Sequence, residues 1–171
     1  MKDEQAGLYI HIPFCLSKCG YCSFYSIKSL NLIPEFINAL NKEINFYRNT
    51  FQSFDTVYLG GGTPSLLTTG QLEKIITAIN KSYRIDTHAE ITMEVNPGDV
   101  SSEYFKALRA LGINRLNIGI QSFDDQILQF LGRRHNSAEA ASAIDNARKA
   151  GFDNIHNLVN YKLIIVQNCM L

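Results

Sequence analysis

The sequence predicts an α/β fold: a parallel β-sheet of four to five consecutive strand–helix units, with the helices outside the sheet. Two observations predict it. The hydrophobic period switches repeatedly between the two-residue repeat of strands and the 3.6-residue repeat of helices, and glycine or proline closes most of these segments. Right-handed crossovers between parallel strands allow either an open doubly wound sheet or an arc of a βα barrel, and the pattern alone leaves both open.

Strand-like and helix-like runs alternate along the chain. Residues 7–14 form the first strand-like run, and residues 34–49 place Phe36, Ile37 and Leu40 on one side of a helix. The later strand-like runs cover residues 54–62, 89–98, 113–120 and the start of 152–171. The later helix-like runs cover residues 68–83, 101–112 and 137–151, and the last of these follows a connection at residues 121–132. Ser101 or Ser102 is expected to cap one helix, and Gly112 to end it.

Composition limits the possible functions. Of the 171 residues, 46% are hydrophobic, which is enough for one substantial core. The 16 Lys and Arg residues balance the 16 Asp and Glu residues, so no bulk charge favours nucleic acid or an anionic membrane surface, and we expect no nucleic-acid partner. The N-terminus is acidic where a signal peptide is basic, and no apolar run approaches the ~20 residues of a membrane span. We therefore expect a cytoplasmic protein without a transmembrane segment.

Three cysteines, Cys15, Cys19 and Cys22, follow the first strand directly. Cytosolic thiols stay reduced, so such a cluster indicates a metal or redox-active site. Three thiolates are too few for a closed four-cysteine zinc site, and Cys169, in a tail of weak pattern, is a poor fourth ligand. A [4Fe–4S] cluster on three thiolates leaves one iron free to bind another ligand. Two alternatives are a zinc site completed by His11 and a set of incidental cysteines.

Other unusual residues also follow predicted strands. Residues 59–64, LGGGTP, form a turn whose N–H groups suit a carboxylate or phosphate, although a plain tight turn is the alternative. Glu94 and Gln121 end the third and fourth strands and are either ligand contacts or surface caps. Residues 133–135, RRH, are either ligand contacts or solvated surface. In both architectures the loops at the C-terminal ends of the strands build the site, which is where all these motifs lie.

Together, these motifs resemble the radical S-adenosylmethionine (SAM) enzymes of the oxygen-independent coproporphyrinogen oxidase group. The likeness covers about residues 7–155 and consists of C-x3-C-x2-C, GGGTP, E-x-NPG and IGIQSFDD…LGRRH, in that order. It implies a partial (βα) barrel of the radical SAM type, an external electron donor, and a [4Fe–4S] cluster on Cys15, Cys19 and Cys22 whose free iron binds SAM. The SAM contacts that the resemblance implies are Tyr9, Tyr21, Gly61, Gly62, Thr63, Glu94, Gln121 and Arg133.

Within this group the chain resembles the haem-chaperone branch, HemW. The oxidases carry another cysteine two positions after the third, where this chain has Ser23 and Phe24. The resemblance therefore implies a protein that carries or inserts haem. Two alternatives stay open: an oxidase that decarboxylates a porphyrinogen, and a non-catalytic remnant that binds only a metal or cluster.

The likeness is lost after Ile155. Leu158 stands where the family has an aspartate that contacts SAM, and the Gly-Leu-Pro that follows it in the family is missing. We therefore expect residues 1–155 to be the N-terminal part of a radical SAM core, truncated after four to five βα units. Residues 156–171 are expected to be a divergent tail, produced by a frameshift or truncation. This departure predicts a chain that is not fully active as an enzyme.

Overall fold

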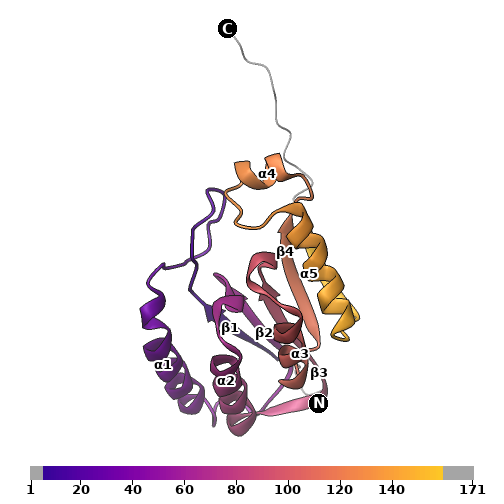
Figure 1. The fold of residues 1–171 in the computed structure, drawn as a ribbon. Helices are drawn as coiled ribbons and strands as arrows, with labels where there is room; N and C mark the ends of the chain where they lie inside the picture. Colours follow the sequence, from indigo (N-terminus) through magenta and orange to yellow (C-terminus); the bar gives the residue numbers. More distant parts are fainter. Residues whose placement is uncertain (1–5, 160–171) are drawn as a thin grey trace.

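The computed structural model describes residues 6–159, which form a five-stranded parallel sheet (Figure 1). The strands are β1 (Gly7–Ile12), β2 (Ser53–Gly61), β3 (Arg84–Val95), β4 (Arg115–Gln121) and β5 (Asn154–Val159), and they lie in that spatial order. Each neighbouring pair is parallel. A doubly wound sheet would reverse its strand order at a switch point, and this sheet does not. The structure thus confirms the parallel α/β prediction and selects the barrel arc.

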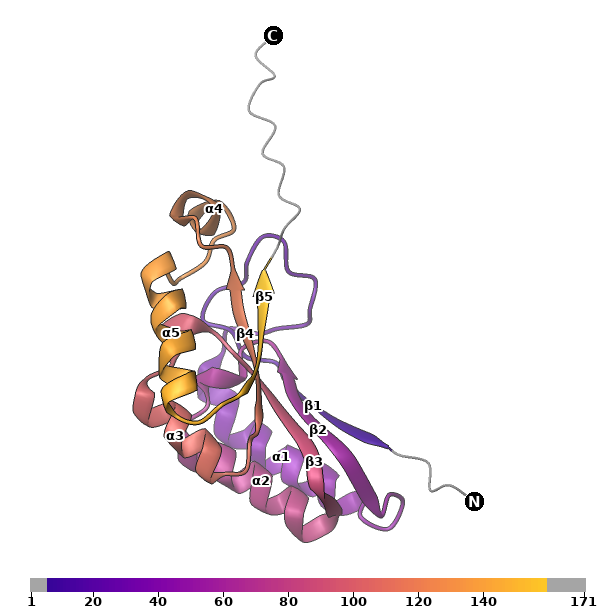
Figure 2. The ribbon, with the colours of Figure 1, turned by 90° about the vertical axis from the view of Figure 1, so that its right-hand side faces the viewer.

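The long helices cover one face of the sheet, as Figure 2 shows. They are α1 (Ile33–Phe46), α2 (Thr69–Ser82), α3 (Ser102–Ala110) and α5 (Ser137–Lys149); the short α4 (Asp125–Phe130) lies beyond the end of β4, and three short 3-10 turns cover Leu30–Leu32, Pro64–Leu66 and Pro97–Asp99. Right-handed crossovers between strands in sequential order place every helix on the same side. The opposite, concave face of the sheet carries no helix among residues 6–159.

Helix boundaries follow the predicted caps. The Ser101 side chain accepts a hydrogen bond from Tyr104 N at the start of α3. Gly112, two residues past the end of α3, has a φ of 89°, the left-handed conformation that favours glycine. In α1 the buried residues are Ile33, Ile37, Leu40 and Ile44. Apolar stripes of this kind pack on the convex face of the sheet and leave its concave face to polar side chains.

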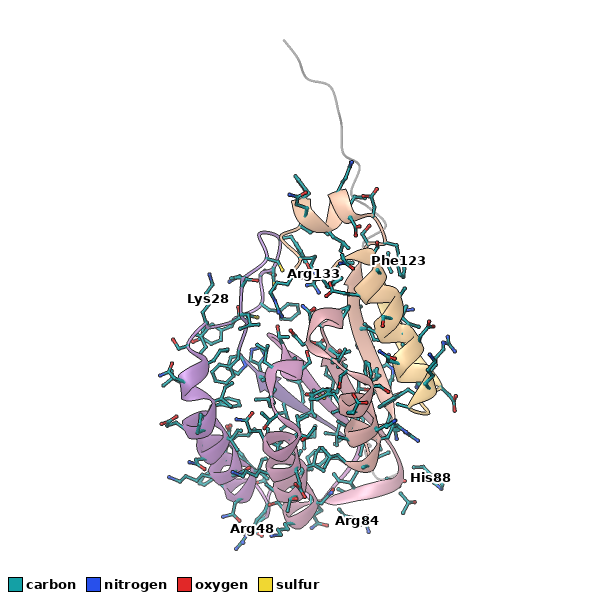
Figure 3. All side chains as sticks on the ribbon, viewed as in Figure 1. Lys28, Arg48, Arg84, His88, Phe123 and Arg133 are labelled. Atoms are coloured by element: carbon teal, nitrogen blue, oxygen red, sulfur yellow. The ribbon has the colours of Figure 1, made fainter. Side chains whose placement is uncertain are left out.

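The third strand begins at Arg84, five residues before the predicted start at residue 89. Phe54 pairs with Ile85 and Thr56 with Glu90, so residues 86–89 bulge out of the register. Residues 86–88 are exposed and polar, so they lack the alternation by which a strand is recognised. Arg84 and His88 lie at the end of the molecule opposite Arg133 (Figure 3).

The fifth strand crosses the boundary expected after residue 155. It pairs with β4 from Asn154 to Val159, and Leu158 near its end is 38% exposed. The boundary itself stays a prediction, because Cys169 and the rest of the expected tail lie outside the described residues. Within residues 6–159, no helix is long and apolar enough to cross a membrane.

Candidate functional site

The cysteine loop leaves β1 and is closed at its base by two backbone hydrogen bonds. Cys15 N donates to Ile27 O at 3.0 Å, and Ile27 N donates to Pro13 O at 2.7 Å. The Cys15 side chain is buried, whereas those of Cys19 and Cys22 are half-buried. The loop between the two closing bonds therefore projects the three thiols at the C-terminal end of β1, as predicted.

The surroundings of the cysteines suit an anionic group. All three cysteines line one cavity, together with Lys18, Arg133 and Arg134. No carboxylate side chain lines this cavity among the described residues. Thiolate ligands carry negative charge, which Lys18 and Arg133 would offset, whereas Arg134 is paired with the Asp99 carboxylate. The residues present therefore fit a thiolate-bound cluster.

The zinc alternative with His11 fits the structure poorly. The two ring nitrogens of His11 are 3.1 Å from Tyr9 Oη and 3.1 Å from Tyr25 O, and His11 does not line the cysteine cavity. Among residues 6–159, no three Cys, His, Asp or Glu side chains are grouped to hold one metal ion. A mononuclear zinc site needs its ligand atoms within about 2.0–2.3 Å of one point. A [4Fe–4S] cluster instead puts each thiolate on a different iron atom, so its ligands are spread apart.

Arg133 connects the cysteine loop to the end of β4. One terminal nitrogen donates to Gly119 O at 2.6 Å, and the other lies 3.8 Å from Cys19 Sγ and 3.4 Å from Tyr21 Oη. Its Nε is buried without a hydrogen-bond partner. Burial raises the pKa of Tyr21, and Arg133 beside it opposes part of that shift. Figure 3 shows Arg133 at the α4 end of the molecule.

The glycine turn does not offer open N–H groups, contrary to expectation. The N–H groups of residues 61–63 all donate within the chain. Their acceptors are Glu94 Oε2 at 3.1 Å, Ile12 O at 2.8 Å and Phe14 O at 2.7 Å. A Cβ built on Gly62 would lie 2.6 Å from Phe14 O. Glycine is therefore required here because the turn packs against the backbone that enters the cysteine loop, and Thr63 Oγ1 then reaches Cys15 Sγ at 3.4 Å.

Glu94 is held by two donors. Its Oε2 accepts from Gly61 N, and its Oε1 accepts from Tyr58 Oη at 2.7 Å. Asn117 Nδ2 lies 2.6 Å from the same phenol oxygen, and the Tyr58 ring stacks on that of Tyr9 with centroids 5.8 Å apart. Burial and the Glu94 hydrogen bond raise the pKa of Tyr58 to about 12, so the phenol stays protonated at neutral pH.

Sequence reasoning missed Tyr58 and Asn117. No local signal in the sequence could have found them, because strand register brings them to the site. Tyr58 lies directly opposite Tyr9, and Asn117 directly opposite Glu94, so both share the face of these predicted site residues.

Residues 133–135 all contact other parts of the chain: His135 is buried and Arg133 half-buried, so these two are not solvated surface, whereas Arg134 is exposed. Arg134 lies 2.8 Å from the Asp99 carboxylate. His135 is buried, and its Nε2 is 3.0 Å from Ile120 O. Gln121, at the end of β4, has a φ of 67°, an unusual conformation for a residue other than glycine, of the kind that clusters at functional sites.

The fold and the site define a class: an arc of a βα barrel that carries a three-cysteine loop and polar strand ends at its C-terminal edge. Comparison with known proteins agrees. The model of the radical SAM superfamily matches residues 9–168, and the chain belongs to this superfamily. Membership implies a [4Fe–4S] cluster and SAM as cofactors.

Individual relatives narrow the likeness. The chain is 39% identical to the haem chaperone HemW of Haemophilus influenzae over 95% of its own length and 46% of that protein. It is 41% identical to HemW of Bacillus subtilis, over 86% of this chain and 40% of the relative. Among solved structures, coproporphyrinogen III oxidase of Escherichia coli superposes with a TM-score of 0.84 at 27% identity, over 90% of this chain and 36% of that one. The chain thus spans less than half the length of the relatives it matches.

Proposed function

We propose that this chain is the cluster- and SAM-binding part of a haem chaperone of the HemW type. The observation that carries the proposal is the three-cysteine cavity, walled by Lys18, Arg133 and Arg134 and free of carboxylates among residues 6–159. Sequence identity of 39–41% to proteins named as haem chaperones supports the assignment to that branch. The reduced thiols that the site requires favour the cytoplasm as its location.

In this proposal, Cys15, Cys19 and Cys22 each ligate one iron of the cluster. When bound and reduced by an electron donor, such a cluster would supply the electron for the reductive cleavage of SAM. Arg133 balances the charge of the Cys19 thiolate. Thr63 donates its hydroxyl proton to Cys15 Sγ and so orients that ligand.

The remaining predicted contacts surround one end of the sheet. Glu94 offers carboxylate oxygens to the amine or hydroxyl groups of SAM, and Gln121 lies at the end of the adjacent strand. Tyr9 and Tyr21 contribute aromatic surface. Gly61 and Gly62 act less directly: they let the turn at residues 61–63 lie against the cysteine loop, which brings Thr63 to the cluster ligands.

The proposal is tested by anaerobic reconstitution of the full chain with iron and sulfide. We expect close to four iron atoms per chain and the broad visible absorbance of a [4Fe–4S] cluster. Cys19→Ser should remove both, whereas the matched control Cys169→Ser should leave both unchanged. Stoichiometric zinc without iron uptake would refute the cluster assignment.

The alternative activity, oxidative decarboxylation of coproporphyrinogen III, is favoured by the structural likeness to the E. coli oxidase. The two activities separate in paired assays on the reconstituted chain. A haem chaperone is expected to shift and sharpen the Soret band of haemin on titration, and to give no product from coproporphyrinogen III. Decarboxylated product would favour the oxidase; failure of both assays would leave the cluster-binding remnant.

A further inference from the structure

We propose that Tyr58 is a positioning residue for the SAM site. Its hydroxyl group holds Glu94 and its ring holds Tyr9, while Asn117 sets the direction of the hydroxyl group. The inference rests on the proposed function, because Glu94 and Tyr9 are assigned there as SAM contacts. Neither Tyr58 nor Asn117 belongs to the motifs that carry the family resemblance.

Strand register brings these residues together. Tyr9 of β1 lies directly opposite Tyr58 of β2, and Glu94 of β3 lies directly opposite Asn117 of β4. Each is a cross-strand pair of neighbouring parallel strands, so the two side chains of a pair lie next to each other on one face of the sheet. The Tyr58 side chain joins the two pairs, because its ring stacks on Tyr9 and its hydroxyl reaches both Glu94 and Asn117.

Donor and acceptor counting gives the network a single direction. A carboxylate only accepts, so Tyr58 must donate its one hydroxyl proton to Glu94 Oε1, 2.7 Å away. The phenol oxygen can then only accept from Asn117, whose Nδ2 lies 2.6 Å away. Asn117 is 6% exposed, and its Oδ1 is buried without a hydrogen-bond partner among residues 6–159. The order of donation is therefore Asn117 to Tyr58 to Glu94.

The arrangement leaves Glu94 one orientation. Oε2 is held by Gly61 N and Oε1 by the Tyr58 hydroxyl, so the carboxylate cannot turn without losing a hydrogen bond. Its remaining lone pairs are thereby aimed before SAM binds, and a preorganised group loses less conformational freedom on binding. Removal of the hydroxyl should free this rotation without removing any group that contacts SAM.

The experiment measures binding of radiolabelled SAM to the cluster-reconstituted full chain by anaerobic equilibrium dialysis. Tyr58→Phe keeps the ring against Tyr9 and loses only the hydroxyl. We expect its dissociation constant to rise about tenfold, equivalent to about 1.4 kcal/mol. Tyr58→Leu removes the ring contact as well and should bind more weakly still. The matched control is Tyr104→Phe, whose hydroxyl donates to Leu67 O at 2.9 Å, and its SAM affinity should not change.

A double-mutant cycle separates positioning from a general structural effect. If Tyr58 acts through Glu94, then Tyr58→Phe should change SAM affinity by less than twofold in a Glu94→Gln background. Asn117→Ser, too short to reach the phenol, should weaken binding alone but add nothing to Tyr58→Phe. Unchanged affinity in Tyr58→Phe, or a full tenfold loss in the Glu94→Gln background, overturns the positioning role alone. No SAM binding by the loaded wild-type chain overturns the proposed function and this inference with it.

Discussion

Gly62 is the residue at which a single added methyl group should do most damage to the cofactor loops. A Cβ built there lies 2.6 Å from Phe14 O and 3.0 Å from Ile12 O, and both atoms are backbone that cannot move aside cheaply. Gly62→Ala must therefore push the turn away from the chain entering the cysteine loop. That movement strains the hydrogen bonds from Gly62 N to Ile12 O at 2.8 Å and from Thr63 N to Phe14 O at 2.7 Å.

Two such hydrogen bonds are worth about 1 kcal/mol each, and overpacking adds about 1–3 kcal/mol, which gives a loss of about 3–5 kcal/mol in the free energy of unfolding. For a chain of this size, about 1 kcal/mol lowers the melting temperature by about 2–4 °C. Calorimetry should therefore show a fall of about 6–20 °C, and iron content after reconstitution should fall too, because Cys15 follows Phe14 directly.

The matched control is Gly70→Ala in the first turn of α2, where an added Cβ meets nothing within 4 Å. It should leave iron content unchanged and melting temperature unchanged or slightly higher, because alanine favours a helix over glycine. If Gly62→Ala melts like the wild type and loads the same iron, the turn does not brace the cysteine loop and the reasoning fails.

Two further predictions concern residues 133–135. Burial lowers the pKa of His135 in the folded chain below its ordinary value near 6.5. As the pH falls through that value, the unfolded chain therefore takes up a proton on His135 more readily than the folded chain does. Stability should be fully present above that value and decline as the pH falls from 7 to 5.5, and His135→Gln should flatten this slope in thermal unfolding; an equal slope in the variant would contradict it. Arg133→Met should speed iron loss to a chelator several-fold, compared with Arg148→Met on the exposed side of α5; equal rates would show that Arg133 does not protect the cluster.

The strand–helix order, the position of the cysteine loop and two helix caps could all be predicted from the sequence. These features rest on local physics: alternation, periodicity, and glycine or serine at helix ends. Ser101 and Gly112 are examples, because each acts within a few residues of its own position. The start of β3 could not be predicted, since only Arg84 and Ile85 pair with β2 before a bulge at residues 86–89, and residues 84–88 are mostly exposed.

Most individual residues of the candidate site could be named from the sequence, but the contacts between them could not. The order of the strands determines which loop meets which, and that order became known only from the structure. The glycine turn illustrates the limit: its motif indicated N–H groups open to a ligand, whereas all three bind acceptors on β1, the cysteine loop and Glu94. The Tyr58 hydrogen bonds could not be predicted for the same reason, because no local pattern shows that Glu94 and Asn117 are register partners.

The loop after α4 shows how the far side of the barrel arc can influence the cysteines. Three consecutive side chains in it have four partners: Arg133 binds Gly119 O and Cys19 Sγ, Arg134 binds Asp99, and His135 binds Ile120 O. The Asp99 side chain is buried, so its pair with Arg134 is screened less than a fully exposed pair and holds the loop against the 3-10 turn Pro97–Asp99 that follows β3. Because Arg133 and His135 both bind the backbone of β4, its carbonyl groups fix where the guanidinium lies relative to Cys19. The cysteine loop is thus positioned from two sides, by the glycine turn after β2 and by this loop after β4.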